Sequence, residues 1–252
     1  SVIRLKAQVV GKEKLCGLDQ KGFEELEKKI ETEILRLVSP VIPEKIIHEQ
    51  FVSWIHNGKR FFPVEIFTTN YDYFYEIACE RNLIPYFDGF VGSYEPFFLP
   101  SSVEENDELP KDWIRLWKVH GSLGWSYNKD KGRIYREKGQ DHLIIYPSLL
   151  KYNDSRKQPY QSFIDRLSAF IRKGESFLLT MGYSFGDQHL NETIFHALTR
   201  TKSSAVYSLY FGDLDEHHFL TQLAKREPRL SVLGNNAAII GGRFAPWRLS
   251  RE

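Results

Sequence analysis

Short apolar runs alternate with amphipathic patterns along most of this chain, and this alternation constrains its fold more than any other feature. Apolar runs typical of buried strands occupy residues 61–69, 113–121, 141–148, 175–185, 204–212 and 236–242. Apolar residues at helical spacing occupy residues 18–39, 43–58, 72–82, 160–174, 187–200 and 214–227. Strands that alternate with helices build mostly parallel sheets whose two faces are covered. We therefore predict an α/β fold with a mostly parallel sheet and helices on both faces.

Composition excludes several classes of protein. No apolar run approaches the roughly 18 residues that a membrane-spanning helix needs, so we expect no membrane partner. The 34 basic and 33 acidic residues leave a net charge of +1, and we expect no direct nucleic-acid binding. The two cysteines, Cys16 and Cys79, are too few for a disulfide framework or a four-cysteine zinc site. A cytoplasmic location is the resulting expectation.

The length of 252 residues suits one large domain or two small ones, and we predict a single domain over residues 1–252. The hydrophilic segments 100–112 and 126–142 are interpreted as loops or insertions, and the second alternatively forms a small hairpin. The chain begins at Ser1, and its one methionine is Met181. We therefore expect further sequence on the N-terminal side.

Three of the predicted strands end in polar sequence. The first is followed by "TTNYD", the second runs into "KVHGSLGW", and the third runs into "MGYSFGDQHLNE". In open parallel sheets, ligands bind just beyond the carboxyl ends of the strands. If the three strands are parallel, their ends lie at one edge, and the sequence predicts a binding site there. Its candidate residues are Asn70, Asp72, His120, Gly121, Ser122, Gly182, Ser184 and Asp187.

Each of these segments also has a purely structural interpretation, and the residues alone leave both open. Asn70 and Asp72 are good N-caps for the helix predicted after them. His120 could be a hydrogen-bonded core histidine before a glycine turn, and the third segment could be a tight turn followed by an aspartate cap. His189 and Glu192 have helical spacing for a metal, but no third ligand is nearby in the sequence, so no metal site is predicted.

The order of these three motifs resembles the sirtuin-like superfamily, and more closely its bacterial branch of NAD-cleaving domains used in antiphage defence. The resemblance covers roughly residues 45–245. It implies a Rossmann-like fold with NAD as the substrate. By resemblance, Asn70 orients the nicotinamide ribose and a water, Asp72 helps hold the nicotinamide side, and His120 is the catalytic histidine. The resemblance implies cofactor-binding roles for Thr69, Asp72, Gly121, Ser122, Gly182, Ser184 and Asp187.

The sequence departs from the family pattern in two ways. Residues 1–39 contain no Gly-Ala-Gly type loop of the kind that holds the pyrophosphate, so we expect this chain to lack the N-terminal Gly-rich strand and loop. The two cysteines also cannot form the four-cysteine zinc module of protein-deacylating sirtuins. We therefore expect no zinc, and water rather than an acyl-lysine oxygen as the nucleophile.

The resulting hypothesis is an NAD+ glycohydrolase that releases nicotinamide and ADP-ribose and depletes NAD in antiphage defence. Constant activity would be toxic, so we expect gating by assembly into a homo-oligomer or by a partner. A HerA-type ATPase is one such partner, and another phage-sensing protein is the alternative. Two other functions stay open: an NAD or ADP-ribose sensing module without turnover, and an atypical NAD-dependent protein deacylase.

Overall fold

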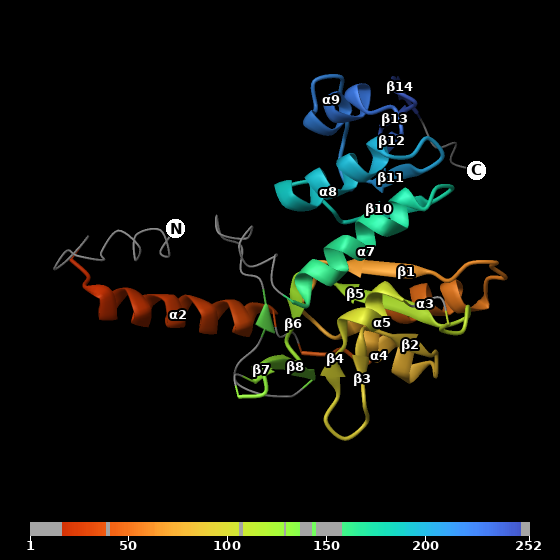
Figure 1. Ribbon diagram of the computed structural model, residues 1–252. Coiled ribbons are helices and arrows are strands. Elements are labelled where there is room, and N and C mark those ends of the chain that lie inside the picture. The colour runs from red at the N-terminus through yellow and green to blue at the C-terminus, as the bar shows by residue number, and fades with distance from the viewer. Residues whose placement is uncertain are drawn as a thin grey trace. The chain divides into compact units, whose positions relative to one another are not determined.

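A computed structural model describes residues 17–38, 41–105, 108–128, 130–136, 143–144 and 158–247 of the chain. The chain divides into two compact units, residues 1–163 and residues 164–252, and each is described by itself (Figure 1). The prediction of one domain over residues 1–252 stays a prediction. No helix in the described part of the chain is long and apolar enough to cross a membrane.

The first unit is built on a parallel sheet of three strands. Strand β1 (Glu65–Thr68) and strand β2 (Tyr86–Phe87) flank the central strand β5 (Ile114–Lys118). Both neighbours run parallel to β5, and the last registered pair of β1 and β5 is Thr68 with Lys118. All five residues of β5 are buried, as expected for the centre of a sheet that is covered on both faces.

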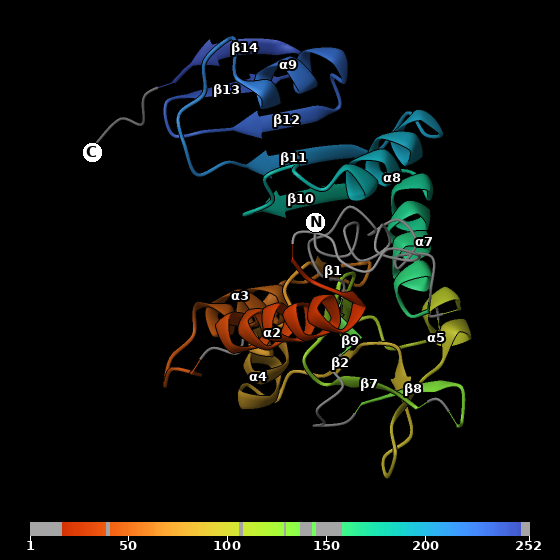
Figure 2. The ribbon, with the colours of Figure 1, turned by 90° about the vertical axis from the view of Figure 1, so that its left-hand side faces the viewer.

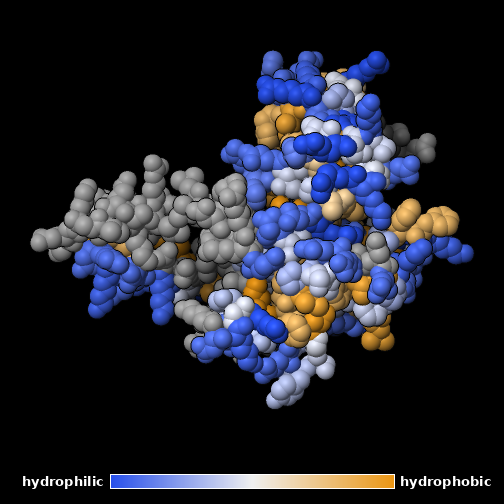
Figure 3. Space-filling model, in the orientation of Figure 1, coloured by the Kyte–Doolittle hydropathy of each residue, from blue (hydrophilic) through white to orange (hydrophobic). Residues whose placement is uncertain are grey.

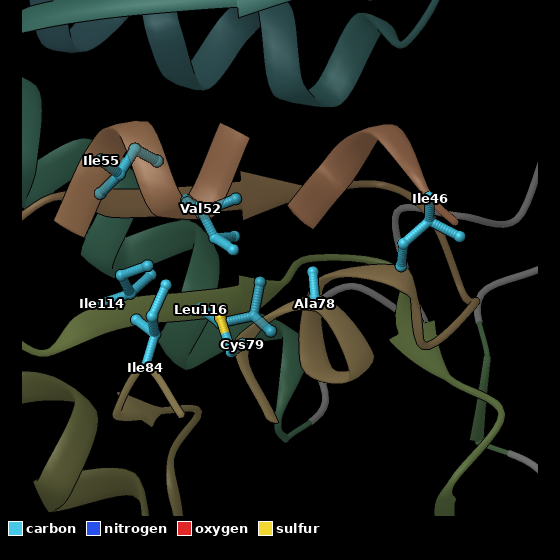
Figure 4. Close-up of a cluster of buried hydrophobic side chains, with 9 residues drawn as sticks. Ile46, Val52, Ile55, Ala78, Cys79, Ile84, Ile114 and Leu116 are labelled. Atoms are coloured by element: carbon cyan, nitrogen blue, oxygen red, sulfur yellow. The ribbon is translucent and has the colours of Figure 1, made fainter. Parts of the chain in front are cut away.

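Helices α3 (Ile47–Asn57) and α4 (Phe74–Arg81) cover one face of this sheet. Their apolar side chains meet those of alternate residues on β1 and β5, as Figure 4 shows for the cluster. Because successive side chains of a strand point to opposite faces, this face is defined by Ile66, Ile114 and Leu116. The buried members of the cluster are Ile46, Val52, Ile55, Ile66, Ala78, Cys79, Ile84, Ile114 and Leu116.

An aromatic cluster covers the opposite face of the sheet. Trp117 of β5 is fully buried, and its ring centroid lies 5.7 Å from that of Phe163 on α7 (Tyr160–Arg172). Phe163 also packs against Phe98 of β4 (Phe97–Phe98) and Trp125 of β7 (Trp125–Asn128). The latter two strands belong to an antiparallel sheet of order β3-β4-β8-β7, with β3 at Phe90–Val91 and β8 at Arg133–Arg136. This face of the parallel sheet is therefore covered by aromatic side chains from an antiparallel sheet and by Phe163.

Helix α2 (Gln20–Val38) precedes this core in the sequence. Phe23 near its start is buried, whereas Glu33 and Arg36 are exposed and form an ion pair of 2.6 Å. The lower surface of α2 in Figure 3 is hydrophilic. The charged outer face that the helical spacing predicts for this segment is therefore present.

The second unit contains a five-stranded sheet in sequential order (Figure 2). Strands β10 (Phe177–Met181), β11 (Ala205–Leu209) and β12 (Leu230–Leu233) are parallel, and β13 (Ala237–Ile240) and β14 (Arg243–Pro246) continue the sheet antiparallel. Helix α8 (Gln188–Thr199) connects β10 to β11, and α9 (Phe219–Arg226) connects β11 to β12. Each parallel pair is therefore joined through a helix, as the alternating pattern predicts.

Two of the predicted strands are confirmed but pair antiparallel, and one predicted loop contains a helix. The run at 236–242 forms β13, which continues the five-stranded sheet antiparallel to β12. Within 141–148 only Leu143–Ile144 (β9) is described, and it pairs antiparallel with β6 (Gly121–Ser122); the rest of that run lies outside the described residues. The predicted loop 100–112 contains a short helix, α5 (Pro100–Glu104). The alternative hairpin in 126–142 is confirmed as β7 and β8.

Candidate functional site

Two of the three polar segments meet in the first unit. We call residues 69–73 the β1 exit loop and residues 119–124 the β5 exit loop. The amide of Val119 donates to the carbonyl of Thr68 at 3.0 Å, and the amide of Leu123 donates to the carbonyl of Tyr71 at 3.1 Å. The two loops therefore continue side by side beyond the paired strands. The predicted meeting of strand ends at one edge is confirmed for β1 and β5.

The β1 exit loop presents Asn70 at the surface. Asn70 is exposed, and its amide donates to the Thr68 hydroxyl at 3.1 Å, which turns the chain as it leaves the strand. Thr69 beside it is half-buried. Asp72 accepts the amide of Phe74 at 3.0 Å through Oδ1, so its carboxylate satisfies a backbone donor at the start of α4. The N-cap position of α4 is Tyr73 and has no side-chain cap, so Asp72 supports the start of the helix from the residue before the cap.

The β5 exit loop contains His120, Gly121 and Ser122. His120 is half-buried and, like Asn70, comes two residues after the last registered strand pair, Thr68 with Lys118. Gly121 has a φ of +97°, a conformation that side chains with a Cβ rarely adopt. The Ser122 hydroxyl is buried and accepts the Gly124 amide at 3.3 Å. This arrangement favours a structural role for the Ser122 side chain and leaves His120 as the titratable group of this loop.

The buried ammonium group of Lys118 forms hydrogen bonds to both exit loops. The Lys118 side chain is 2% exposed, and its Nζ lies 2.7 Å from Oε1 of Glu76 on α4. The same nitrogen donates to the carbonyl of Asp72 and lies 3.4 Å from the carbonyl of Tyr71, both in the β1 exit loop. It also lies 3.3 Å from the Ser122 hydroxyl in the β5 exit loop. One side chain thus bonds to both loops and to the helix that follows the first.

The Glu76 carboxyl group is electrostatically unusual. Burial raises its pKa, and the attraction of Lys118 opposes this shift. Its second oxygen, Oε2, is buried and has no hydrogen-bond partner among the described residues. Asp88 is also buried, and burial likewise raises its pKa against the opposing charge of Arg136, with which it forms an ion pair. Arg136 is 40% exposed, whereas both side chains of the Lys118–Glu76 ion pair are largely buried, at 2% and 13% exposure. The Lys118–Glu76 ion pair is also the one whose ammonium forms hydrogen bonds to both exit loops among the described residues.

A second histidine lies near the β1 exit loop. His48 of α3 stacks on Phe74 with 5.3 Å between ring centroids and makes an edge contact with Tyr75 at 4.8 Å. Burial lowers its pKa, while the negative charge of Asp72 opposes that shift. Its ring contacts and its half-buried position favour a packing role at the start of α4.

The third polar segment lies in the second unit, after β10. Gly182 and Ser184 are exposed, and Asp187 caps α8 by accepting the amides of His189 and Leu190 at 3.1 and 3.2 Å. The Tyr183 hydroxyl donates to Asn191 at 2.7 Å, which fixes the segment to the helix. Burial raises the pKa of Tyr183, so this hydroxyl keeps its proton. The capping interpretation of Asp187 is therefore correct.

The structure thus brings Thr69, Asn70, Asp72, His120, Gly121 and Ser122 together on two adjacent loops. Gly182, Ser184 and Asp187 form a second group in the other unit, which is described separately. Sequence reasoning missed Lys118, Glu76 and His48. The sequence contains one indication of Lys118, because it is a lysine at the end of an otherwise apolar strand, directly before the histidine motif.

The described residues contain no group of three or more His, Cys, Asp or Glu side chains that could hold a metal ion. Cys79 is a buried residue of α4, and burial raises the pKa of its thiol to about 12, so it is a packed, protonated side chain. Cys16 lies outside the described residues. The expectation of no zinc stays a prediction.

Parallel strands joined through helices, with polar loops at their carboxyl ends, define a Rossmann-like α/β protein. The family model for the SIR2-like domain matches residues 64–230, which include both exit loops and the segment after β10. The chain therefore belongs to the SIR2-like domain family. Membership indicates an NAD-related activity. No protein of curated function matches the chain.

Proposed function

We propose that this protein is an NAD+ glycohydrolase that cleaves the bond between nicotinamide and ribose, with water as the nucleophile. The observation that carries the proposal is the joining of two exit loops that present Asn70 and His120 at equivalent positions beyond one pair of parallel strands. Membership of the SIR2-like domain family supports NAD as the ligand. The products are nicotinamide and ADP-ribose.

The residue types suit this chemistry. Cleavage of an N-glycosidic bond passes through an oxocarbenium-like state, as glycoside cleavage does. The nicotinamide departs as a neutral molecule, so the site needs no strong acid. It must instead fix the ribose, orient a water and remove a proton. A histidine titrates near neutral pH and suits the last task, and an asparagine amide can orient a water without adding charge.

In this proposal His120 removes the proton from the attacking water or from a ribose hydroxyl, and Asn70 holds the water against the ribose. Thr69, Asp72, Gly121 and Ser122 line the nicotinamide side, either through side chains or through the loop backbone that they shape. Gly182, Ser184 and Asp187 take the adenosine side. Their place in the family-matched segment supports this assignment.

The test is NAD turnover by the full chain, with product analysis, beside Asn70→Ala and His120→Ala. His217→Ala is the matched control, because His217 is an exposed histidine of the other unit. Release of nicotinamide and ADP-ribose that is lost in both loop variants and kept in the control is the expected result. Loss of about 100-fold or more in kcat is expected for His120→Ala, the usual size of a general-base contribution.

Two other outcomes would redirect the assignment. NAD binding without turnover under any condition would favour a sensing module that recognises NAD or ADP-ribose. Nicotinamide release that depends on an added acyl-lysine peptide would identify a protein deacylase. Both arms use the same protein and the same chromatographic readout, so one experiment separates the three functions.

We further propose that the activity is gated and serves antiphage defence, because unregulated NAD loss would kill the host cell. The gate is a homo-oligomer, a HerA-type ATPase or another phage-sensing partner. Light scattering at several concentrations would give the assembly state. Turnover measured with and without the product of the neighbouring gene would show whether a partner switches the activity on. Equal turnover by the protein alone and with that partner would contradict gating by the partner.

A further inference from the structure

We propose that Lys118 is a positioning residue: its buried ion pair with Glu76 holds the β1 and β5 exit loops together, so that Asn70 and His120 act on one substrate. The substrate class rests on the proposed NAD cleavage, whereas the loop-holding role rests on contacts alone. Lys118 touches no substrate in this account. It acts through the backbone of one loop and a hydroxyl of the other.

The contacts of the ammonium group carry the argument. A lysine ammonium has three donors and no acceptor, and here it faces a carboxylate, a backbone carbonyl and a hydroxyl. These belong to Glu76 at 2.7 Å, to Asp72 and to Ser122 at 3.3 Å. The ammonium lies 5.3 Å from the centroid of the Tyr73 ring, which adds a favourable cation–π contact. All its partners therefore lie in the two loops or in α4.

The placement of this charge is hard to explain by stability alone. Buried ion pairs are often no more stabilising than well-packed apolar residues of similar volume, because both charges lose their hydration. The Glu76 oxygen Oε2 is left without a hydrogen bond within the described residues, so the pair is not fully satisfied. The pair instead fixes the geometry of the two loops, because two carbonyl oxygens of the β1 exit loop and one hydroxyl of the β5 exit loop converge on one nitrogen.

The test replaces both charges together, because Lys118→Met alone would leave Glu76 buried and unpaired and could prevent folding. The double variant Lys118→Met/Glu76→Leu removes the pair and fills its space with apolar atoms. The matched control is Arg136→Met/Asp88→Leu, which removes an ion pair of this unit whose carboxylate is buried, at 8% exposure, and whose guanidinium is 40% exposed. Within the described residues neither side chain of that pair forms a hydrogen bond with an exit loop, although burial raises the pKa of Tyr73 in the β1 exit loop and the charge of Arg136 opposes that shift.

Hydrogen–deuterium exchange and NAD turnover are measured on the same three full-length proteins. In Lys118→Met/Glu76→Leu, amides of both exit loops should exchange about tenfold faster or more than in wild type, while the control keeps wild-type exchange there. The kcat should fall about 100-fold at comparable melting temperature, because small misplacements of catalytic groups have effects of this size. The control should stay within about threefold of wild-type kcat.

The other possible outcomes would overturn one or both parts of the proposal. Unchanged exchange at both loops in Lys118→Met/Glu76→Leu would overturn the loop-holding role, whatever the turnover. Faster exchange with a kcat equal to that of the control would overturn the positioning role. If wild type releases no nicotinamide with or without its partner, the proposed function fails, and the exchange result alone then supports or overturns the loop-holding role.

Discussion

Phe163 is the residue on which the aromatic face of the first unit depends most. It is fully buried, and its ring lies 5.5 Å from Phe98, 5.7 Å from Trp117 and 5.8 Å from Trp125, measured between centroids. Phenylalanine to alanine at a buried site costs about 3–5 kcal/mol. Aromatic pairs add about 0.5–1.5 kcal/mol beyond burial, so we expect Phe163→Ala to lie in the upper part of that range.

Urea denaturation followed by tryptophan fluorescence measures this cost, because Trp117 and Trp125 report directly from the cluster. Phe177→Ala is the matched control, since Phe177 is 58% exposed and stacks only on Tyr207 at 4.8 Å among the ring contacts of the described residues. It should cost less than about 1 kcal/mol. If Phe163→Ala costs no more than Phe177→Ala at an unchanged m-value, the burial argument for this face is wrong.

Three further substitutions test particular contacts. A Cβ at Gly124 would lie 2.4 Å from the Tyr73 hydroxyl, so Gly124→Ala should lower the free energy of unfolding by about 1–3 kcal/mol; an unchanged urea midpoint would contradict this. Asp187→Ala should cost about 0.5–2 kcal/mol through the lost cap of α8, whereas Asp187→Asn should recover most of it in thermal melts. Burial lowers the pKa of His48 below 6.5, so the stability contributed by its neutral form is present above about pH 6.5 and is lost as pH falls through the folded-state pKa. His48→Phe should therefore flatten the fall in stability between about pH 7 and about pH 5, and parallel curves for the two proteins would refute this.

The apolar runs predicted the strands that carry the site because buried parallel strands leave a near-continuous apolar signal. The runs around Ile66 and Leu116 correspond to β1 and β5. The run around Leu178 corresponds to β10, in which only Thr180 is buried. Strand direction could not be predicted, since the run at 236–242 has the same apolar composition as a parallel strand but returns antiparallel after a short turn. The two-residue strands β2, β3 and β4 are too short for any periodicity to indicate them.

The positions of the candidate residues at the strand ends could be predicted from the sequence, whereas the buried side chains next to them could not. Asn70 and His120 could be found because polar residues directly after apolar runs mark the edge of a parallel sheet. Glu76 gave no such signal, and the lysine that ends the apolar run at position 118 could not be assigned a buried role, because a charge inside a strand or helix pattern is usually a solvated residue. Their pairing depends on the register of β5 against β1 and on the face of α4 that packs there, and both come from tertiary structure.

The hydrogen-bond acceptors of the two exit loops explain why the Lys118–Glu76 ion pair is buried next to these loops. The β1 exit loop offers carbonyl oxygens of Tyr71 and Asp72, and the β5 exit loop offers the Ser122 hydroxyl, so an apolar residue at position 118 would leave these acceptors buried without a donor. A lysine supplies the donors, and Glu76 neutralises its charge. An apolar pair would restore packing, and the released loops could turn these acceptors to water instead of leaving them buried without a donor. We therefore expect Lys118→Met/Glu76→Leu to retain its melting temperature to within a few degrees and to lose turnover, and a large drop in both would show that the pair acts chiefly on stability.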